Sequence, residues 1–157
     1  MLDVVDTAVK IGLGALIAPV GTYLLASKNH KSELKKAFNE ERRAIIKEIA
    51  TTLEEIEAQF NQSFDAFHHS DYDSARNILV PTSKNAYSMR ALANILDDDD
   101  LVNSIDKIAR IVEDIYIEVV GHNPKSINKI EELGVRLSSV KKESYPFIRK
   151  IYRETSA

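Results

Sequence analysis

Residues 45–67, IIKEIATTLEEIEAQFNQSFDAF, decide the fold, because their apolar side chains recur at steps of three and four residues. This spacing places the apolar side chains on one face of an α-helix. Leu34 and Phe38 extend the pattern toward the N-terminus, with a charged interruption at residues 40–43. We therefore predict a long helix over residues 32–67. No Pro or Gly occurs between Thr22 and Val80, so this helix is free to begin further upstream.

Residues that favour helix ends divide the rest of the chain into three more predicted helices. The polar run at residues 68–73 contains Ser and Asp, which are favoured helix N-caps. The four aspartates at residues 97–100 favour a helix N-terminus, so the third helix should begin near Asp99 or Asp100 and stop at Gly121. Asn123 and Pro124 match the first positions of a fourth helix. The second and fourth helices contain Pro81 and Pro146, each of which either kinks its helix or divides it.

Each of these helices has its own apolar stripe. The expected core positions are Leu79, Thr82, Ala86, Met89, Ala93 and Leu96 in the second helix, Leu101, Ile105, Ile108, Val112, Ile115 and Val119 in the third, and Ile127, Ile130, Leu133, Leu137 and Val140 in the fourth. No segment alternates with a period of two. With short connections, this pattern predicts an all-α fold in which an antiparallel four-helix bundle has a long first helix. The apolar stripe of that first helix also permits a coiled coil, although packing within one chain explains it equally well.

An uncharged segment at residues 11–26, IGLGALIAPVGTYLLA, precedes the bundle. A helix of this length spans about 24 Å, slightly less than the hydrocarbon core of a bilayer. We predict a single transmembrane helix, with residues 1–27 as the membrane segment and residues 28–157 as the bundle. A cleaved signal peptide is disfavoured, because Asp3 and Asp6 stand where basic residues are usual. A buried core helix remains the alternative, because the apolar run is short.

Basic side chains follow this segment and predict its orientation. Lys28, Lys31, Lys35 and Lys36 come after it, whereas Lys10 alone precedes it. The positive-inside rule then places the N-terminus outside and the bundle in the cytoplasm, as expected in a bacterial inner membrane. We call these four lysines the basic collar, and we expect it to contact anionic lipid headgroups.

Small residues line the predicted membrane helix at helical spacing. They include Gly12, Ala15 and Thr22 on one stripe, and Gly14, Ala18 and Gly21 on another. Small side chains let helix backbones approach closely in lipid. These six residues are therefore the predicted helix-packing positions of a homo-oligomer.

Composition excludes several classes of function. The chain has 157 residues, a net charge of −3, 44% hydrophobic residues and no cysteine. That excludes a disulfide framework, a thiolate metal site and a cysteine nucleophile. Residues 51–120 carry a net charge of −9, with basic segments on either side. An acidic centre argues against nucleic acid as a partner.

Few residues are candidates for catalysis or metal binding. His68, His69, Asp71 and Asp73 cluster in a predicted turn without the spacing of a metal site. The aspartate run at residues 97–100 lacks the Gly and the distal Glu of a calcium loop. Three glutamates at residues 54–57 lack the Glu-x-x-His partner of a di-iron bundle, and we expect them on an exposed face. We therefore predict no enzyme, no metal, no cofactor and no small-molecule substrate.

Three functions agree with this pattern. The first is a non-enzymatic, membrane-anchored bundle that acts as an interaction, scaffold or regulatory module at the cytoplasmic face, binding a protein partner or itself. The second is a membrane-active effector, similar to a holin, toxin or defence protein, whose Gly/Ala-rich helix oligomerises and permeabilises the membrane. The third is a soluble bundle whose first segment packs in a core or against another subunit.

Overall fold

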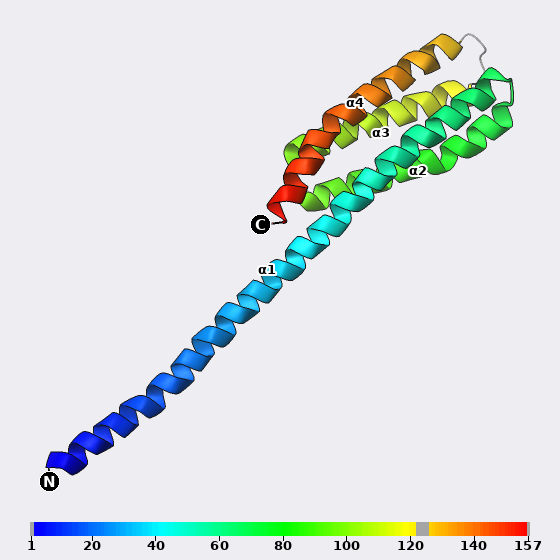
Figure 1. Ribbon diagram of the computed structural model, residues 1–157. Coiled ribbons are helices and arrows are strands. Elements are labelled where there is room, and N and C mark those ends of the chain that lie inside the picture. The colour runs from blue at the N-terminus through cyan, green and yellow to red at the C-terminus, as the bar shows by residue number, and fades with distance from the viewer. Residues whose placement is uncertain (1, 122–125, 157) are drawn as a thin grey trace. The chain divides into compact units, whose positions relative to one another are not determined.

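The computed structural model describes residues 2–121 and 126–156, with side chains from residue 30 onward. Helix α1 spans Leu2–His68, α2 spans Tyr72–Leu96, α3 spans Asp99–Val120 and α4 spans Ile127–Glu154 (Figure 1). The described residues contain no strand. The predicted all-α class is confirmed, and the first helix begins far upstream of residue 32.

The chain divides into two compact units, Met1–Glu40 and Glu41–Ala157. The second unit is a helical bundle, formed by the C-terminal part of α1 with α2, α3 and α4. Its helices alternate in direction: Arg42 and Ser63 of α1 bond to Leu96 and Ala75 of α2 respectively. The predicted boundary between residues 27 and 28 stays a prediction.

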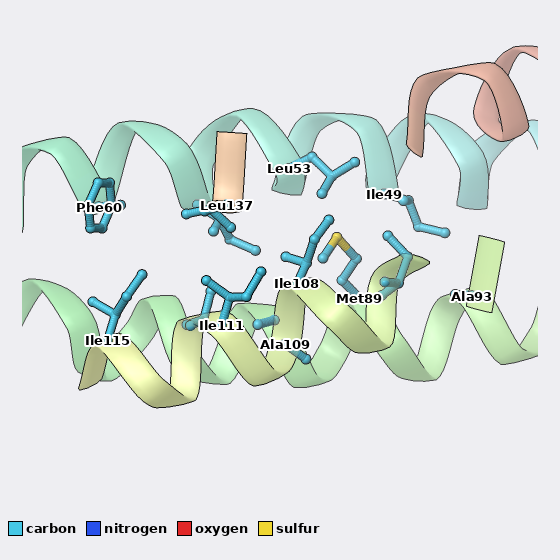
Figure 2. Packing of buried hydrophobic residues seen from close by; sticks show 14 of the residues in the cluster. Ile49, Leu53, Phe60, Met89, Ala93, Ile108, Ala109, Ile111, Ile115 and Leu137 are labelled. Atoms are coloured by element: carbon cyan, nitrogen blue, oxygen red, sulfur yellow. The ribbon is translucent and has the colours of Figure 1, made fainter. Parts of the chain in front are cut away.

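The core of the bundle consists of the predicted stripes (Figure 2). Every expected core position of α2 and α3 is buried, and Met89 and Ile108 have no exposed surface. From α1, the largest buried contributors include Ile49, Leu53 and Phe60. Packing within one chain thus accounts for the α1 stripe from residue 45 onward. Burying a Leu or Ile side chain contributes about 1.5–3 kcal/mol, so these stripes dominate the stability of the bundle.

Two parts of the predicted core differ from the structure. Leu34 and Phe38 are more than half exposed, and they belong to the Met1–Glu40 unit rather than to the bundle. In α4, Ile127 and Val140 are only half-buried, whereas Lys141 and Ser144 are buried at the next positions of the stripe. The apolar period of α4 therefore continues through polar side chains, which a search for apolar residues cannot detect.

The predicted helix ends are confirmed where the structure describes them. Asp71 and Asp98 precede α2 and α3, and their carboxylates accept hydrogen bonds from the backbone N–H groups of Ser74 and Leu101. Gly121 follows α3. The predicted first positions of α4, Asn123 and Pro124, lie outside the described residues.

Both internal prolines lie within continuous helices. Helix α2 runs through Pro81 and α4 runs through Pro146, so neither helix is divided. The two proline side chains are exposed, and water can bond to the carbonyl that each leaves without an N–H donor.

No helix in the described part of the chain combines the length and the apolarity needed to cross a bilayer. The predicted span, residues 11–26, lies within α1 among the residues whose side chains the structure does not describe.

Candidate interaction surfaces

The described lysines of the basic collar are exposed on α1. Lys31 and Lys35 stand one helical turn apart, which places them on the same face. The Lys36 ammonium lies 4.0 Å from the Glu40 carboxylate, and both side chains are well exposed. An ion pair this exposed contributes little to stability, so Lys36 is accessible to other anions. The side chain of Lys28 lies outside the described residues.

The predicted helix-packing residues all fall within α1. Gly12, Gly14, Ala15, Ala18, Gly21 and Thr22 belong to the stretch whose side chains are not described. Their role in packing two membrane helices stays a prediction.

Two arginines of α1 hold the C-terminal ends of two other helices. Arg42 donates a hydrogen bond of 3.2 Å to the carbonyl of Leu96, at the end of α2. Arg43 donates one of 2.6 Å to the carbonyl of Thr155, directly after α4, and its guanidinium lies 6.0 Å from the Tyr152 ring centroid. Cations stabilise helix C-termini, where carbonyls lack partners within the helix. We call Arg42 and Arg43 the arginine clasp.

A polar cluster joins the middle of α1 to α4. The Lys141 side chain is only 10% exposed, and its ammonium donates to Glu54 Oε2 at 2.6 Å and to Glu57 Oε2. The Tyr145 hydroxyl donates to the other oxygen of Glu54. Glu54 and Glu55 are exposed, as predicted, whereas Glu57 is only 29% exposed, so the prediction of an exposed glutamate face is wrong for Glu57 alone. We call Lys141, Glu54, Glu57 and Tyr145 the lysine cluster.

Charge pairing sets the protonation of the lysine cluster. The hydrogen bond from Lys141 lowers the pKa of both Glu54 and Glu57. Burial alone would lower the pKa of Lys141, but its bonds to Glu54 and Glu57 outweigh that effect and raise it. Burial and the neighbouring Glu54 carboxylate raise the pKa of Tyr145. The cluster therefore holds one ammonium between two carboxylates near neutral pH, an arrangement suited to fixing helix register.

The turn between α1 and α2 arranges its polar residues for local bonding. His69 Nδ1 lies 2.8 Å from the Asp65 carbonyl, and Asp71 caps α2. Of the aspartate run, Asp98 caps α3 and accepts a hydrogen bond of 3.0 Å from Lys150. Within the described residues, no group of three or more His, Cys, Asp or Glu side chains is placed to hold a metal ion.

A mainly apolar groove of about 650 Å³ lies along α2 beside α3. Val80 and Tyr87 from α2 and Tyr116 from α3 line it, together with Lys84 and three small residues of α2, Ser83, Ser88 and Ala91. The Glu113 carboxylate of α3 raises the pKa of Tyr87, so these two side chains meet at the junction of the helices. The apolar residues of this surface fall outside the core stripes, so the sequence pattern does not predict it.

No protein family, curated protein or solved structure matches this chain significantly.

The arginine clasp and the lysine cluster were not predicted from the sequence either. Both had a signal in the sequence: charged residues interrupt an otherwise apolar helical stripe at residues 40–43 and at Lys141.

Proposed function

We propose that this protein is a membrane-anchored helical bundle that acts as a non-enzymatic interaction module at the cytoplasmic face. One observation carries the proposal: a single helix, α1, includes both the uncharged residues 11–26 and the core residues of the bundle from Ile45 onward. The exposed lysines of the collar lie between these two stretches. Anchor, collar and bundle thus follow one another along one helix.

The exposed collar supports the orientation in this proposal. Each Lys close to an anionic membrane surface contributes about 1 kcal/mol of attraction. Lys31 and Lys35 lie on one face, where they can contact the same headgroup layer. The surface of the bundle supports an interaction role, because apolar side chains on α2 and α3 face solvent. The buried Lys141, in contrast, is already paired with two carboxylates of its own chain.

Membrane fractionation of the full chain tests the anchor. We expect the protein to stay with membranes through alkaline carbonate and high salt, and to be released by detergent. The substitution Ile17→Arg should release it, because an arginine at the centre of a span costs about 2.5–3.5 kcal/mol. Val135→Arg introduces the same charge at an exposed site of α4 and should leave membrane association unchanged. Release of the unsubstituted protein by carbonate would contradict the anchor and favour the soluble-bundle alternative.

The orientation has its own test, because the chain lacks cysteine. A Ser139→Cys substitution places a single thiol on an exposed position of α4. A membrane-impermeant maleimide should label this thiol only after the membrane is permeabilised, which gives the reagent access to the inner face. Labelling of this thiol in intact cells or spheroplasts would show that the bundle lies outside, the opposite of the proposed topology.

A second candidate function, membrane permeabilisation, is favoured by the spacing of Gly14, Ala18 and Gly21. It predicts that expression collapses the membrane potential and that Gly14→Leu or Gly21→Leu prevents this collapse. An unchanged potential at high expression argues against this function and leaves the interaction module in place.

A further inference from the structure

Within the bundle, residues 41–68 of α1 pack differently from the other three helices. Cα atoms of α3 lie within 8 Å of Cα atoms of α2 and of α4 at many positions, whereas such close approaches are rare between α1 and any other helix. The backbone of α1 therefore stands farther from its neighbours than the backbones of α2 and α4 stand from α3. Figure 2 shows the side chains of Ile49, Leu53 and Phe60 filling the space beneath the α1 ribbon.

The sizes of the buried side chains explain this difference in spacing. Helices α2, α3 and α4 bury several small residues: Ala75, Ala86 and Ala93 in α2, Ser104 and Ala109 in α3, and Ser144 in α4. Small side chains at a helix contact shorten the distance between the two axes. With the exception of Ser63, the residues that α1 buries are Ile, Leu and Phe, which hold it at a greater distance.

The stripe that α1 buries is also narrower than that of α3. From Ile46 to Phe67, the buried residues of α1 recur strictly at alternating steps of three and four, as in a seam that faces one side. In α3, adjacent residues are buried in pairs: Ser104 with Ile105, Ile108 with Ala109, and Ile111 with Val112. Helix α3 is thus covered over a wide arc, whereas α1 is covered on one side only.

Polar contacts hold much of α1 in place. The arginine clasp and the lysine cluster join it to α2 and α4. In addition, Ser63 Oγ donates a hydrogen bond of 2.9 Å to the Ala75 carbonyl, and Thr82 Oγ1 donates one of 2.9 Å to Gln59 Oε1. Water can replace each of these partners when α1 moves away, which offsets most of the energy of the lost bonds.

We propose that the bundle opens at α1: residues 41–68 detach as one segment, while α2, α3 and α4 stay packed together. The hinge is the turn between His68 and Tyr72. Within it Ser70 has a φ of 61°, a left-handed conformation that is unfavourable for a residue other than Gly, and opening frees Ser70 to leave it. The closed and open states differ in exposed apolar surface, which is what a regulated interaction module needs. This inference goes beyond the proposed function and does not depend on the membrane anchor.

Thiol labelling tests the opening, because the chain lacks cysteine. Ser63 on α1 and Ser144 on α4 are 1% and 0% exposed, and their hydroxyls contact Ala75 of α2 and Ser104 of α3 respectively. Ser63→Cys and Ser144→Cys therefore place matched thiols at the α1–α2 and α3–α4 contacts. In the folded full chain, Ser63→Cys should react with a small thiol reagent roughly tenfold faster than Ser144→Cys, because only Ser144→Cys requires the three remaining helices to separate.

A second substitution distinguishes opening at α1 from unfolding of the whole bundle. The Arg90 Nε lies 2.6 Å from Asp106 Oδ1 and joins α2 to α3, a contact that the open state keeps. Arg90→Ala should therefore speed the labelling of Ser144→Cys by roughly fivefold and leave that of Ser63→Cys unchanged. Arg149→Ala, an equal loss of charge at an exposed position of α4, is the matched control and should change neither rate.

Equal labelling rates for the two thiols would overturn the proposal, and so would an effect of Arg90→Ala that is the same for both. The second comparison stays decisive even if Ser63→Cys weakens the closed state, because it compares each thiol with itself. Hydrogen exchange of the unsubstituted chain provides a test without any variant. Amides of residues 49–60 should exchange with a weaker dependence on denaturant than amides of residues 105–115, and an equal dependence would overturn the opening.

Discussion

Lys141 on α4 donates a hydrogen bond of 2.6 Å to Glu54 on α1, a residue 87 positions earlier in the chain. This bond and its counterpart to Glu57 join the first and last helices of the bundle across a buried ammonium. An ammonium removed from water depends on such partners, because burying it unpaired is costly. The pairing therefore determines how α4 docks against α1.

Replacing the buried lysine should destabilise the bundle. We expect Lys141→Ala to lower the free energy of unfolding by about 1–3 kcal/mol, because packing and two charged hydrogen bonds are lost while the carboxylates regain water. Lys141→Met keeps the volume of the side chain and should cost less. Urea unfolding measures both, and Lys142→Ala, on the exposed side of α4, is the matched control. A loss for Lys141→Ala no larger than the control would contradict the structural role of the cluster.

The same cluster should make stability depend on pH at both ends of the scale. The pKa of Glu54 and of Glu57 is lowered in the folded state, so their contribution is present above about pH 4.3, the unfolded value, and is lost as pH falls further. The pKa of Lys141 is raised, so its contribution is complete below about pH 10.4 and is lost at higher pH. Unfolding free energies measured across pH should fall at both limits. Lys141→Met should flatten both falls, and an unchanged profile in this variant would assign the dependence to other groups.

Gly134 should resist substitution although it lies inside a helix. A Cβ at this position of α4 would lie 2.3 Å from Cζ of Phe60, a side chain that is only 7% exposed. Gly134→Ala should therefore destabilise the bundle by about 1–3 kcal/mol, even though Ala favours a helix by about 1 kcal/mol over Gly. In a Phe60→Leu background the same change should cost much less, which a double-mutant cycle measures. Equal costs in both backgrounds would show that the ring is not the obstacle.

The arginine clasp should protect two helix ends, and not the rest of the bundle, from amide hydrogen exchange. Arg42→Ala should increase amide exchange near the C-terminus of α2, and Arg43→Ala near that of α4, because each removes the cation that bonds to a carbonyl at that helix end. Each should cost about 1–2 kcal/mol of unfolding free energy. Lys47→Ala, on an exposed face of α1, should change stability by less than about 0.5 kcal/mol. Uniform exchange throughout the bundle would argue against a local capping role.

Most of the fold could be predicted from local patterns. The stripes of α2 and α3, the caps at Asp71 and Asp98 and the stop at Gly121 each depend on neighbouring residues, and all are found in the structure. The interaction surfaces could not be predicted in this way. Lys141 is buried only because two glutamates lie opposite it on another helix, and the groove beside Tyr87 exists only once α2 and α3 have packed.

The arginine clasp gives the bundle a mechanical property. Adjacent residues at the start of the bundle unit bind the ends of α2 and α4, so tension applied along α1 reaches both helices at the same level. Helices loaded together share the force, whereas helices loaded in sequence would peel away one at a time. We therefore expect a pull from the N-terminal side to act on these two charged hydrogen bonds in parallel.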